Sequence, residues 1–459
     1  LISYFDIRKF SRKKKIHFFI NTGVGVVIAI FFHFIEHTDW SENIINKAFD
    51  LIIIREAEKS AQLTEKKEFK SDKISDRIVF VDIDHATDKD KNQAIDKQWG
   101  EPLITPRNKL ARIIETAYKG GASIIVLDIL LESKDCCNPD NDRQLKTVLE
   151  EMTNKKVPTK VIFPVRIGQK GVIKNNLFDD LIEKNPNFYP AIPDITATAA
   201  DRVIRYWRPY ETFKAANEYS ILWNISFLTA MVAHEKTQEM KELENKIKSQ
   251  RFSGHYSVLL GNGKEIKISE EKDDMYLYRI RFLFIPNGTL DSYPEGNLFK
   301  ELYTSEQLEH MSFADNLVSL KGKIVIVGSS NPDNGDLYPT PIGDMAGMYI
   351  IGNAINTILF GLQPSHSSMY VNILIEFFVI IVAAYCFLYF NVLLAQIIAS
   401  VIFIFALGII SYYYFLHTGV FLNFTFAVVG MSFHRIISNI EEIIEKKGIK
   451  GNDYSESKK

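Results

Sequence analysis

The chain has 459 residues, of which 46% are hydrophobic and 24% are charged, and its formal net charge is −2. This length allows two or three folded units, and the averages are those of an ordinary globular protein. The near-neutral charge gives no overall basic surplus, so we expect no nucleic-acid partner. Three cysteines are too few for a disulfide framework, which excludes small disulfide-stapled domains.

The first apolar segment, residues 17–35, has no Asp, Glu, Lys or Arg and is about as long as a membrane-spanning helix. A basic cluster in residues 8–15 precedes it, which favours a cytoplasmic N-terminus and an external position for the chain that follows. A cleaved signal peptide has a similar pattern. Bulky Phe34 and Ile35 stand where a small-residue cleavage site would be, so we favour a retained anchor.

Three more apolar segments lie near the C-terminus, and the breaks between them are short. Together with the first span they predict four transmembrane helices and a return of the chain to the cytoplasm, where Lys446, Lys447 and Lys450 follow. The predicted boundaries are a basic N-terminus at 1–16, a span at 17–35, an extracytoplasmic domain at 36–367, spans at 369–390, 392–414 and 420–437, and a cytoplasmic tail at 438–459.

The domain between the spans begins with a polar segment, residues 56–73, that we interpret as a helical or flexible stalk. A dense β-branched run at residues 78–84 predicts a strand, and Thr105-Pro106 predicts the start of a helix that Gly120-Gly121 ends. Residues 123–131 form the next apolar run, which completes a βαβ unit with parallel, buried strands.

Further elements are predicted beyond this unit: strands at 160–167, 276–284 and 323–327, an apolar helix at 219–233, a charged helix at 234–248, and a hairpin at 259–268. The expected fold class is therefore α/β. It has a mostly parallel sheet in the extracytoplasmic domain, a helix-and-hairpin insert, and one N-terminal and three C-terminal transmembrane helices.

Polar side chains follow three of these strands. In open α/β sheets, ligands bind at the carboxyl edge of the strands, so a ligand or ion pocket is expected there. Carboxylates at strand ends also commonly cap helices or bind loop N–H groups, and that structural role remains open. The candidate pocket residues are Asp82, Asp84, Asp128, Ser329, Ser330 and Asp336.

No phosphate-binding loop, nucleophile elbow or zinc-protease motif is present, so we expect no enzymatic activity; neither a metal nor a cofactor is indicated. Cys136 and Cys137 are adjacent in an external loop, where a vicinal disulfide or a metal site is an alternative to two free thiols. Within the predicted spans, Asn372 and Glu376 are the polar residues of interest. A carboxylate inside a membrane suggests proton or ion transfer unless it reaches the interface.

The order of these motifs resembles the second class of CHASE domains, extracytoplasmic sensory domains that bacteria attach to histidine kinases, nucleotide cyclases and protein kinases. One span before the domain and three after it are similar to the family's topology, so the resemblance covers residues 17–437. The residues that carry it are Ile78 to Asp84, Pro106-Arg107, Gly121-Ala122, Val126 to Ile129, Gly322 to Ser330, Asp336, Tyr338, Thr340-Pro341, Gly347, Asn353-Ala354 and Gly361, with Asp201 and Arg205 in place of a mid-domain Asp and Arg.

The chain departs from the family in two ways. The tryptophan-proline signature is loosened to Trp99, Gly100, Pro102 and Pro106, and nothing similar to an output module follows residue 437. The resemblance implies no particular ligand.

The resemblance implies a multi-pass sensor or receptor subunit of the bacterial inner membrane, with its large domain in the periplasm or outside the cell. It would signal through a separate protein and could be a homo-oligomer. One alternative is a scaffold subunit of an envelope complex. A weaker one is an ion-coupled membrane component that uses Glu376.

Overall fold

The computed structural model describes residues 11–35, 38–65, 77–83, 106–135, 138–168, 173, 176–215, 218–249, 254–260, 263–270, 277–283, 302–304, 320–330, 336–390 and 392–423. Asp84, Cys136, Cys137, the predicted tail and residues 424–437 of the fourth predicted span lie outside these ranges. The chain divides into two compact units. The helical unit comprises residues 1–52 and 364–459, and the α/β unit comprises residues 53–363.

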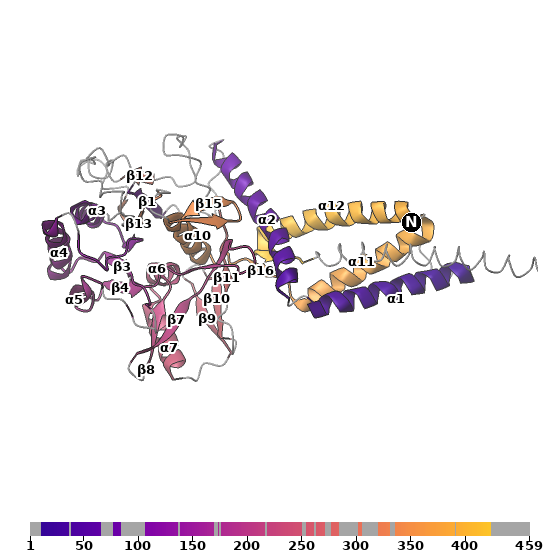
Figure 1. Cartoon of the computed structure of the whole chain (residues 1–459), viewed down its shortest axis with the longest axis horizontal. Coiled ribbons are helices and arrows are strands. Elements are labelled where there is room, and N and C mark those ends of the chain that lie inside the picture. The colour runs from indigo at the N-terminus through magenta and orange to yellow at the C-terminus, as the bar shows by residue number, and fades with distance from the viewer. Residues whose placement is uncertain are drawn as a thin grey trace, which may run out of the picture. The chain divides into compact units, whose positions relative to one another are not determined.

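A six-stranded parallel sheet forms the centre of the α/β unit (Figure 1). Its strand order is β12-β1-β13-β2-β3-β4, and each neighbouring pair runs parallel. Every residue of β1, β2 and β13 is buried, as expected for strands that are covered on both faces. The bounds are β1 Ile78–Asp82, β2 Ile124–Leu127, β3 Lys160–Pro164, β4 Phe188–Ala191, β12 Leu302–Thr304 and β13 Ile324–Gly328.

Helices cover both faces of this sheet. On one face, α3 (Arg107–Lys119) and α4 (Pro139–Asn154) share a core with Val79, Val81 and alternate residues of the other strands. Phe80 points the opposite way and contacts Tyr349 of α10 (Gly347–Leu359), a helix whose residues are all buried. The predicted α/β class with a parallel sheet is therefore confirmed.

The predicted βαβ unit is present as β1-α3-β2. The chain reverses after α3 at Gly121, whose φ of 79° lies in the left-handed region that favours glycine. The two strands of the unit are not neighbours, because β13 lies between them and pairs with both. The last described strand of the sheet in sequence is therefore one of its central strands.

Small antiparallel pairs and two helices occupy the region between β4 and β12. The predicted hairpin is confirmed as β9 paired with β10, and the charged helix as α7. The bounds here are β5 Ile195–Ala197, β6 Ile204–Trp207, β7 Tyr210–Ala215, β8 Glu218–Trp223, α6 Ile225–Ala233, α7 Thr237–Lys248, β9 Gly254–Leu259, β10 Glu265–Glu270 and β11 Tyr278–Arg279, with α5 Asp179–Ile182 ahead of β4, and β14 Leu337–Thr340 and β15 Gly343–Ala346 later in the chain.

Two predicted elements in this region are wrong in extent. The apolar helix expected from residue 219 begins only at Ile225, because the Asn224 side chain accepts hydrogen bonds from two N–H groups of the first turn. The preceding residues pair with β7 instead. The strand expected over residues 276–284 is limited to β11, because residues 281 and 283 donate their N–H groups to side chains of α10.

The helical unit contains α1 (Arg12–Ile35), the first part of α2 (Asp39–Glu65), α11 (Met369–Tyr389) and α12 (Val392–Thr418). The axes of α1 and α11 approach closely at Gly25, where an added Cβ would lie 2.7 Å from Ile380. Small residues allow such close approach between apolar helices. The predicted stalk is helical through Glu65.

Among the described residues, one helix segment, Met369–Cys386, is long and apolar enough to cross a membrane. The spans predicted at 17–35 and 392–414 coincide with α1 and α12. A fourth span cannot begin at Val420, because Val420 and Phe421 form β17, which pairs with β16 (Ser365–His366). Four transmembrane helices remain a prediction.

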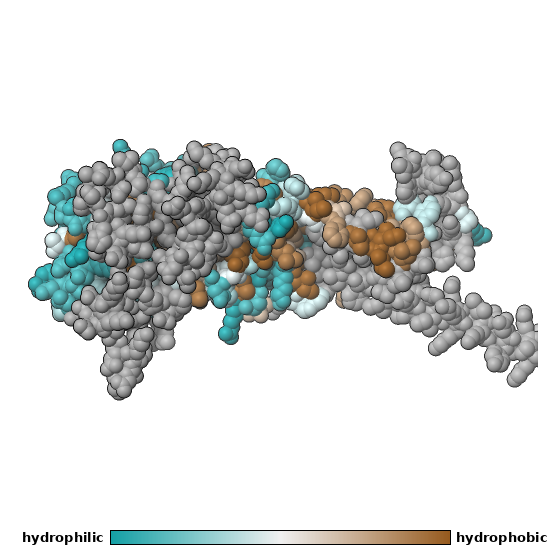
Figure 2. Space-filling model, turned by 90° about the horizontal axis from the view of Figure 1, so that it is seen from above, coloured by the Kyte–Doolittle hydropathy of each residue, from teal (hydrophilic) through white to brown (hydrophobic). Residues whose placement is uncertain are grey.

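Apolar side chains gather on the face of the helical unit that Figure 2 shows. A surface of this kind is typical of helices that contact lipid or other apolar helices. Large exposed apolar residues of α11 and α12 include Tyr370, Leu374, Phe378, Leu394, Val401, Phe405 and Ile409.

Candidate functional site

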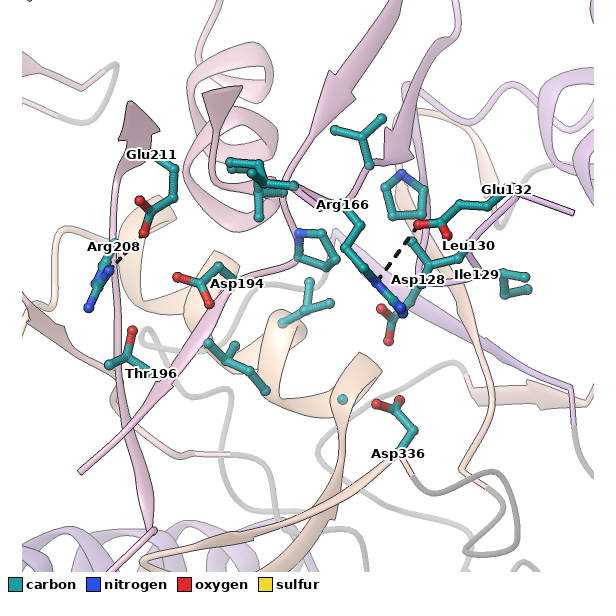
Figure 3. A pocket seen from close by; sticks show the side chains of 18 of the residues that line it. Asp128, Ile129, Leu130, Glu132, Arg166, Asp194, Thr196, Arg208, Glu211 and Asp336 are labelled. Carbon is teal, nitrogen blue, oxygen red and sulfur yellow. Dashed lines mark hydrogen bonds and ion pairs between the residues drawn. The ribbon is translucent and has the colours of Figure 1, made fainter. Parts of the chain in front are cut away.

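A cavity of about 1230 Å³ lies at the carboxyl edge of the parallel sheet (Figure 3). Its walls include residues 128–130, 164–167 and 192–197, which lie at or just after the ends of β2, β3 and β4. The cavity therefore lies where the sequence predicted a site, and it is large enough for a small molecule.

Asp128, Ser329 and Asp336 are the predicted residues that line this cavity. The carboxyl groups of Asp128 and Asp336 point toward one another in Figure 3. Burial, together with the charge of Asp336, raises the pKa of Asp128 from 3.8 to about 8. Two carboxyl groups this close share a site that favours only one negative charge at neutral pH.

Asp336 lies at the N-terminus of α10. Its pKa is raised by burial, and hydrogen bonds from the Tyr338 hydroxyl and the Gly347 N–H oppose that shift. The approach requires a glycine, because a Cβ at position 347 would lie 2.6 Å from Asp336 Oδ2. The positive end of the helix dipole therefore favours the ionised form of Asp336, and Asp128 is the partner that holds the proton.

Asp82 and Ser330, also predicted as pocket residues, are not among the residues that line this cavity. Asp82 is fully buried at the end of β1, and its carboxylate accepts hydrogen bonds from the Ser330 N–H at 2.9 Å and from the Ser330 hydroxyl. The Tyr349 hydroxyl lies 3.4 Å from the same carboxylate. The two residues have each other as partners and fix the turn after β13, which is the structural alternative that the sequence left open.

Four cavity residues were missed by the sequence analysis. Arg166 forms an ion pair with Glu132 at 3.8 Å, and Arg208 forms one with Glu211 at 2.8 Å (Figure 3). Arg166 follows β3 directly, so the rule that ligands bind at strand ends could have found it. Arg208 comes from the connection between β6 and β7 and Glu211 from the start of β7, and no sequence pattern indicated the position of either.

Asp194 is a fifth missed residue and follows β4. Its pKa is raised by burial and by the nearby Glu211. Among the described residues, Asp194, Asp128 and Asp336 have no ion-pair partner. The described wall of the cavity thus has five acidic residues and three arginines, the third arginine being Arg107.

Arg107 fixes the loop that forms one wall. Its guanidinium is 2% exposed and donates to the carbonyl groups of Leu130 and Ser133, while its own N–H donates to Asp135. Asp135 also accepts a bond from the Asn141 side chain at 2.9 Å. This network anchors the residues after β2 to the starts of α3 and α4, so the cavity has a rigid wall.

The remaining candidates lie elsewhere. Arg205 forms a two-bond ion pair with Asp201 at 2.8 Å, away from the cavity wall. Asn372 accepts a hydrogen bond from Ser367 at the start of α11, and Glu376 lies one turn further along that helix. No group of three or more His, Cys, Asp or Glu residues in the described ranges has the arrangement of a metal site.

The structure thus combines an α/β domain that has a cavity at the carboxyl edge of its sheet with apolar helices in the same chain. A family model for the CHASE2 domain matches residues 24–389. The chain belongs to the CHASE2 family, and its α/β unit is an extracytoplasmic sensory domain of that type. Neither the curated proteins nor the solved structures compared with it include a match.

Proposed function

We infer that the chain is a non-catalytic sensor of the cell envelope that binds a small molecule in the cavity and passes the signal to a separate protein. The observation that carries this inference is the position of Asp336, which lines the cavity and also lies at the N-terminus of α10. A ligand that binds one position of this helix better than another shifts the equilibrium between them.

The path of the chain supports a role for α10 in transmission. Residues 360–368 connect the end of α10 to the start of α11, the apolar helix that meets the length of a membrane span. Two side chains of α10, Asn353 and Thr357, accept hydrogen bonds from the N–H groups of Leu283 and Arg281. A displacement of α10 would therefore pull on the connection to α11 and on the segment that contains Arg281 and Leu283.

Hydrogen exchange of the full-length chain in lipid nanodiscs tests ligand binding. The probe is the small-molecule fraction of an envelope extract, and the reporter is the exchange of amides in α10. We expect protection in the wild type and in Ala199→Trp, which lies outside the cavity wall, and weaker protection in Ala197→Trp, which adds an indole to the wall. Equal protection in both variants, or none in the wild type, would refute ligand sensing in this cavity.

Signalling through a partner is supported by the pattern of residues 438–459. Ile440, Ile443 and Ile444 recur at helical spacing among acidic residues, which is typical of a helix that docks on another protein. Affinity isolation in mild detergent, compared between the wild type and the double variant Ile440→Glu/Ile444→Glu, tests this. A set of co-purifying proteins that does not change between the two would contradict docking through the tail.

The proposed topology has four membrane spans with both termini in the cytoplasm of a bacterial cell. Single cysteines introduced at residues 10, 180 and 455 of a Cys-free chain provide the test in intact cells. A membrane-impermeant maleimide should label only the cysteine at residue 180.

Ion coupling through Glu376 is a weaker proposal, and an unaltered signal from Glu376→Gln would remove it.

A further inference from the structure

The charges of the cavity wall indicate which ligands it favours. Glu132 and Glu211 are paired with arginines, whereas Asp128, Asp194 and Asp336 form no ion pair among the described residues, and only Asp194 is close enough to an arginine, Arg208, for its charge to lower the pKa. An unpaired carboxylate in a desolvated place is costly unless a cation joins it. The cavity therefore favours a positively charged group over an anion.

A second observation points to the same place. The Oδ2 atom of Asp128 is inaccessible to solvent and has no hydrogen-bond partner in the described part of the chain. Buried polar atoms of this kind normally have a partner. The carboxyl group of Asp336 faces Asp128 across the cavity, so a donor placed between the two would give Asp128 Oδ2 the partner that it lacks.

The size of the cavity and the composition of its wall favour an organic cation over a metal ion as the ligand. The described acidic residues do not gather in groups of three with metal-ligand geometry, and the cavity is far larger than an ion. Its wall is also partly aliphatic and aromatic, which suits methylene groups. The apolar wall residues include Ile129, Ile167, Ile192, Pro193, Phe213 and Ile351.

We propose that the cavity binds a small aliphatic amine, with one ammonium group between Asp128 and Asp336 and the hydrocarbon chain along the apolar wall. Asp194 provides a second acidic position, so a diamine binds more tightly than a monoamine. This inference rests on the proposed function in one respect, namely that the cavity is the ligand site of the sensor.

Four five-carbon probes test the charge of the ligand: 1,5-diaminopentane, pentylamine, 1,5-pentanediol and glutarate. Isothermal titration of the full-length chain in nanodiscs at pH 8 should show binding of the two amines and none of the diol or the dianion. Glutarate binding without amine binding would overturn the cation inference but leave sensing intact. Absence of binding by all four probes would also overturn it, whereas the proposed function stands or falls on the extract experiment.

Variants locate the amine within the cavity. Asp128→Asn and Asp336→Asn should each weaken diaminopentane binding by about 10- to 100-fold, because a charged hydrogen-bond partner is lost. Asp194→Asn should instead remove the advantage of the diamine over pentylamine. The control Asp180→Asn, at an exposed ion pair outside the cavity, should have no effect. Unchanged affinity in Ala197→Trp would place the binding elsewhere and refute the proposal.

Discussion

The carboxylate of Glu56 and the guanidinium of Arg281 form a two-bond ion pair, with Arg281 Nε donating to Glu56 Oε2 at 2.8 Å. Both side chains are almost completely buried, at 4% and 1% exposure. Glu56 belongs to α2, and Arg281 follows β11 and is bonded to Thr357 of α10. The ion pair therefore links α2 to Arg281, whose backbone is hydrogen-bonded to α10.

Arg281→Met should destabilise the α/β unit by roughly 3–5 kcal/mol, because it leaves the Glu56 carboxylate buried and uncompensated. Arg55→Met is the matched control, since Arg55 lies on the same helix in an exposed pair with Glu58, and such pairs contribute less than about 1 kcal/mol. Urea unfolding of the full chain in detergent, followed by tryptophan fluorescence, measures both. Equal losses in the two variants would contradict the importance of the buried pair.

The stability of the α/β unit should fall as pH rises toward 8. The pKa of Asp128 is raised from 3.8 to about 8 in the folded state, so the folded state binds the proton more tightly than the unfolded state. The resulting stabilisation is complete below pH 3.8 and is lost as pH rises through about 8. Melting temperatures between pH 5 and 9 should decline less in Asp128→Asn than in the wild type. A slope that Asp128→Asn does not alter would assign the effect to other groups.

Amine binding at neutral pH should release a proton. An ammonium group favours the ionised form of Asp128, whose pKa in the free protein is about 8, while aliphatic amines stay charged up to about pH 10. The affinity for diaminopentane should therefore rise between pH 6 and 8, by up to roughly tenfold per pH unit. Titrations in phosphate and in Tris should differ in heat because the two buffers take up the released proton with different enthalpies. Identical heats would exclude coupled proton release.

Gly347→Ala should weaken the contact between Asp336 and α10, because the new Cβ would lie 2.6 Å from Asp336 Oδ2. A loss of about 1–3 kcal/mol is expected from the displaced hydrogen bond, partly offset by the better helix propensity of alanine. A double-mutant cycle with Asp336→Ala tests the cause. If Gly347→Ala costs as much without the Asp336 carboxylate, the glycine is required for a different reason.

The βαβ unit and the parallel sheet could be predicted because their signals are local. Apolar runs of strand length, a Pro at the helix start and paired glycines at its end each depend on a few adjacent residues. Residues 219–223 were assigned to a helix because they are apolar like those that follow. The neighbouring strand β7 and the cap at Asn224 decide otherwise, and neither is visible in that segment alone.

The location of the candidate site could be predicted from the sequence, but the residues that line it could be predicted only in part. Asp128 and Asp336 line the cavity as the strand-end rule implies, whereas Asp82 has the same sequence signature and is bonded to Ser330. The difference depends on strand order, because β13 is the neighbour of β1 and brings Ser330 to Asp82. Sequence patterns do not encode which distant strand becomes the neighbour.

The position of β13 also constrains when the domain can be completed during synthesis. β1 and β2 emerge early but do not pair with one another, and each keeps an open edge until residues 324–328 arrive to join them. Such long-range pairing is slow and exposes the chain to aggregation. The exported polypeptide must therefore be kept from aggregating until shortly before α11 is made, and a protein shortened ahead of residue 324 should fail to assemble this sheet.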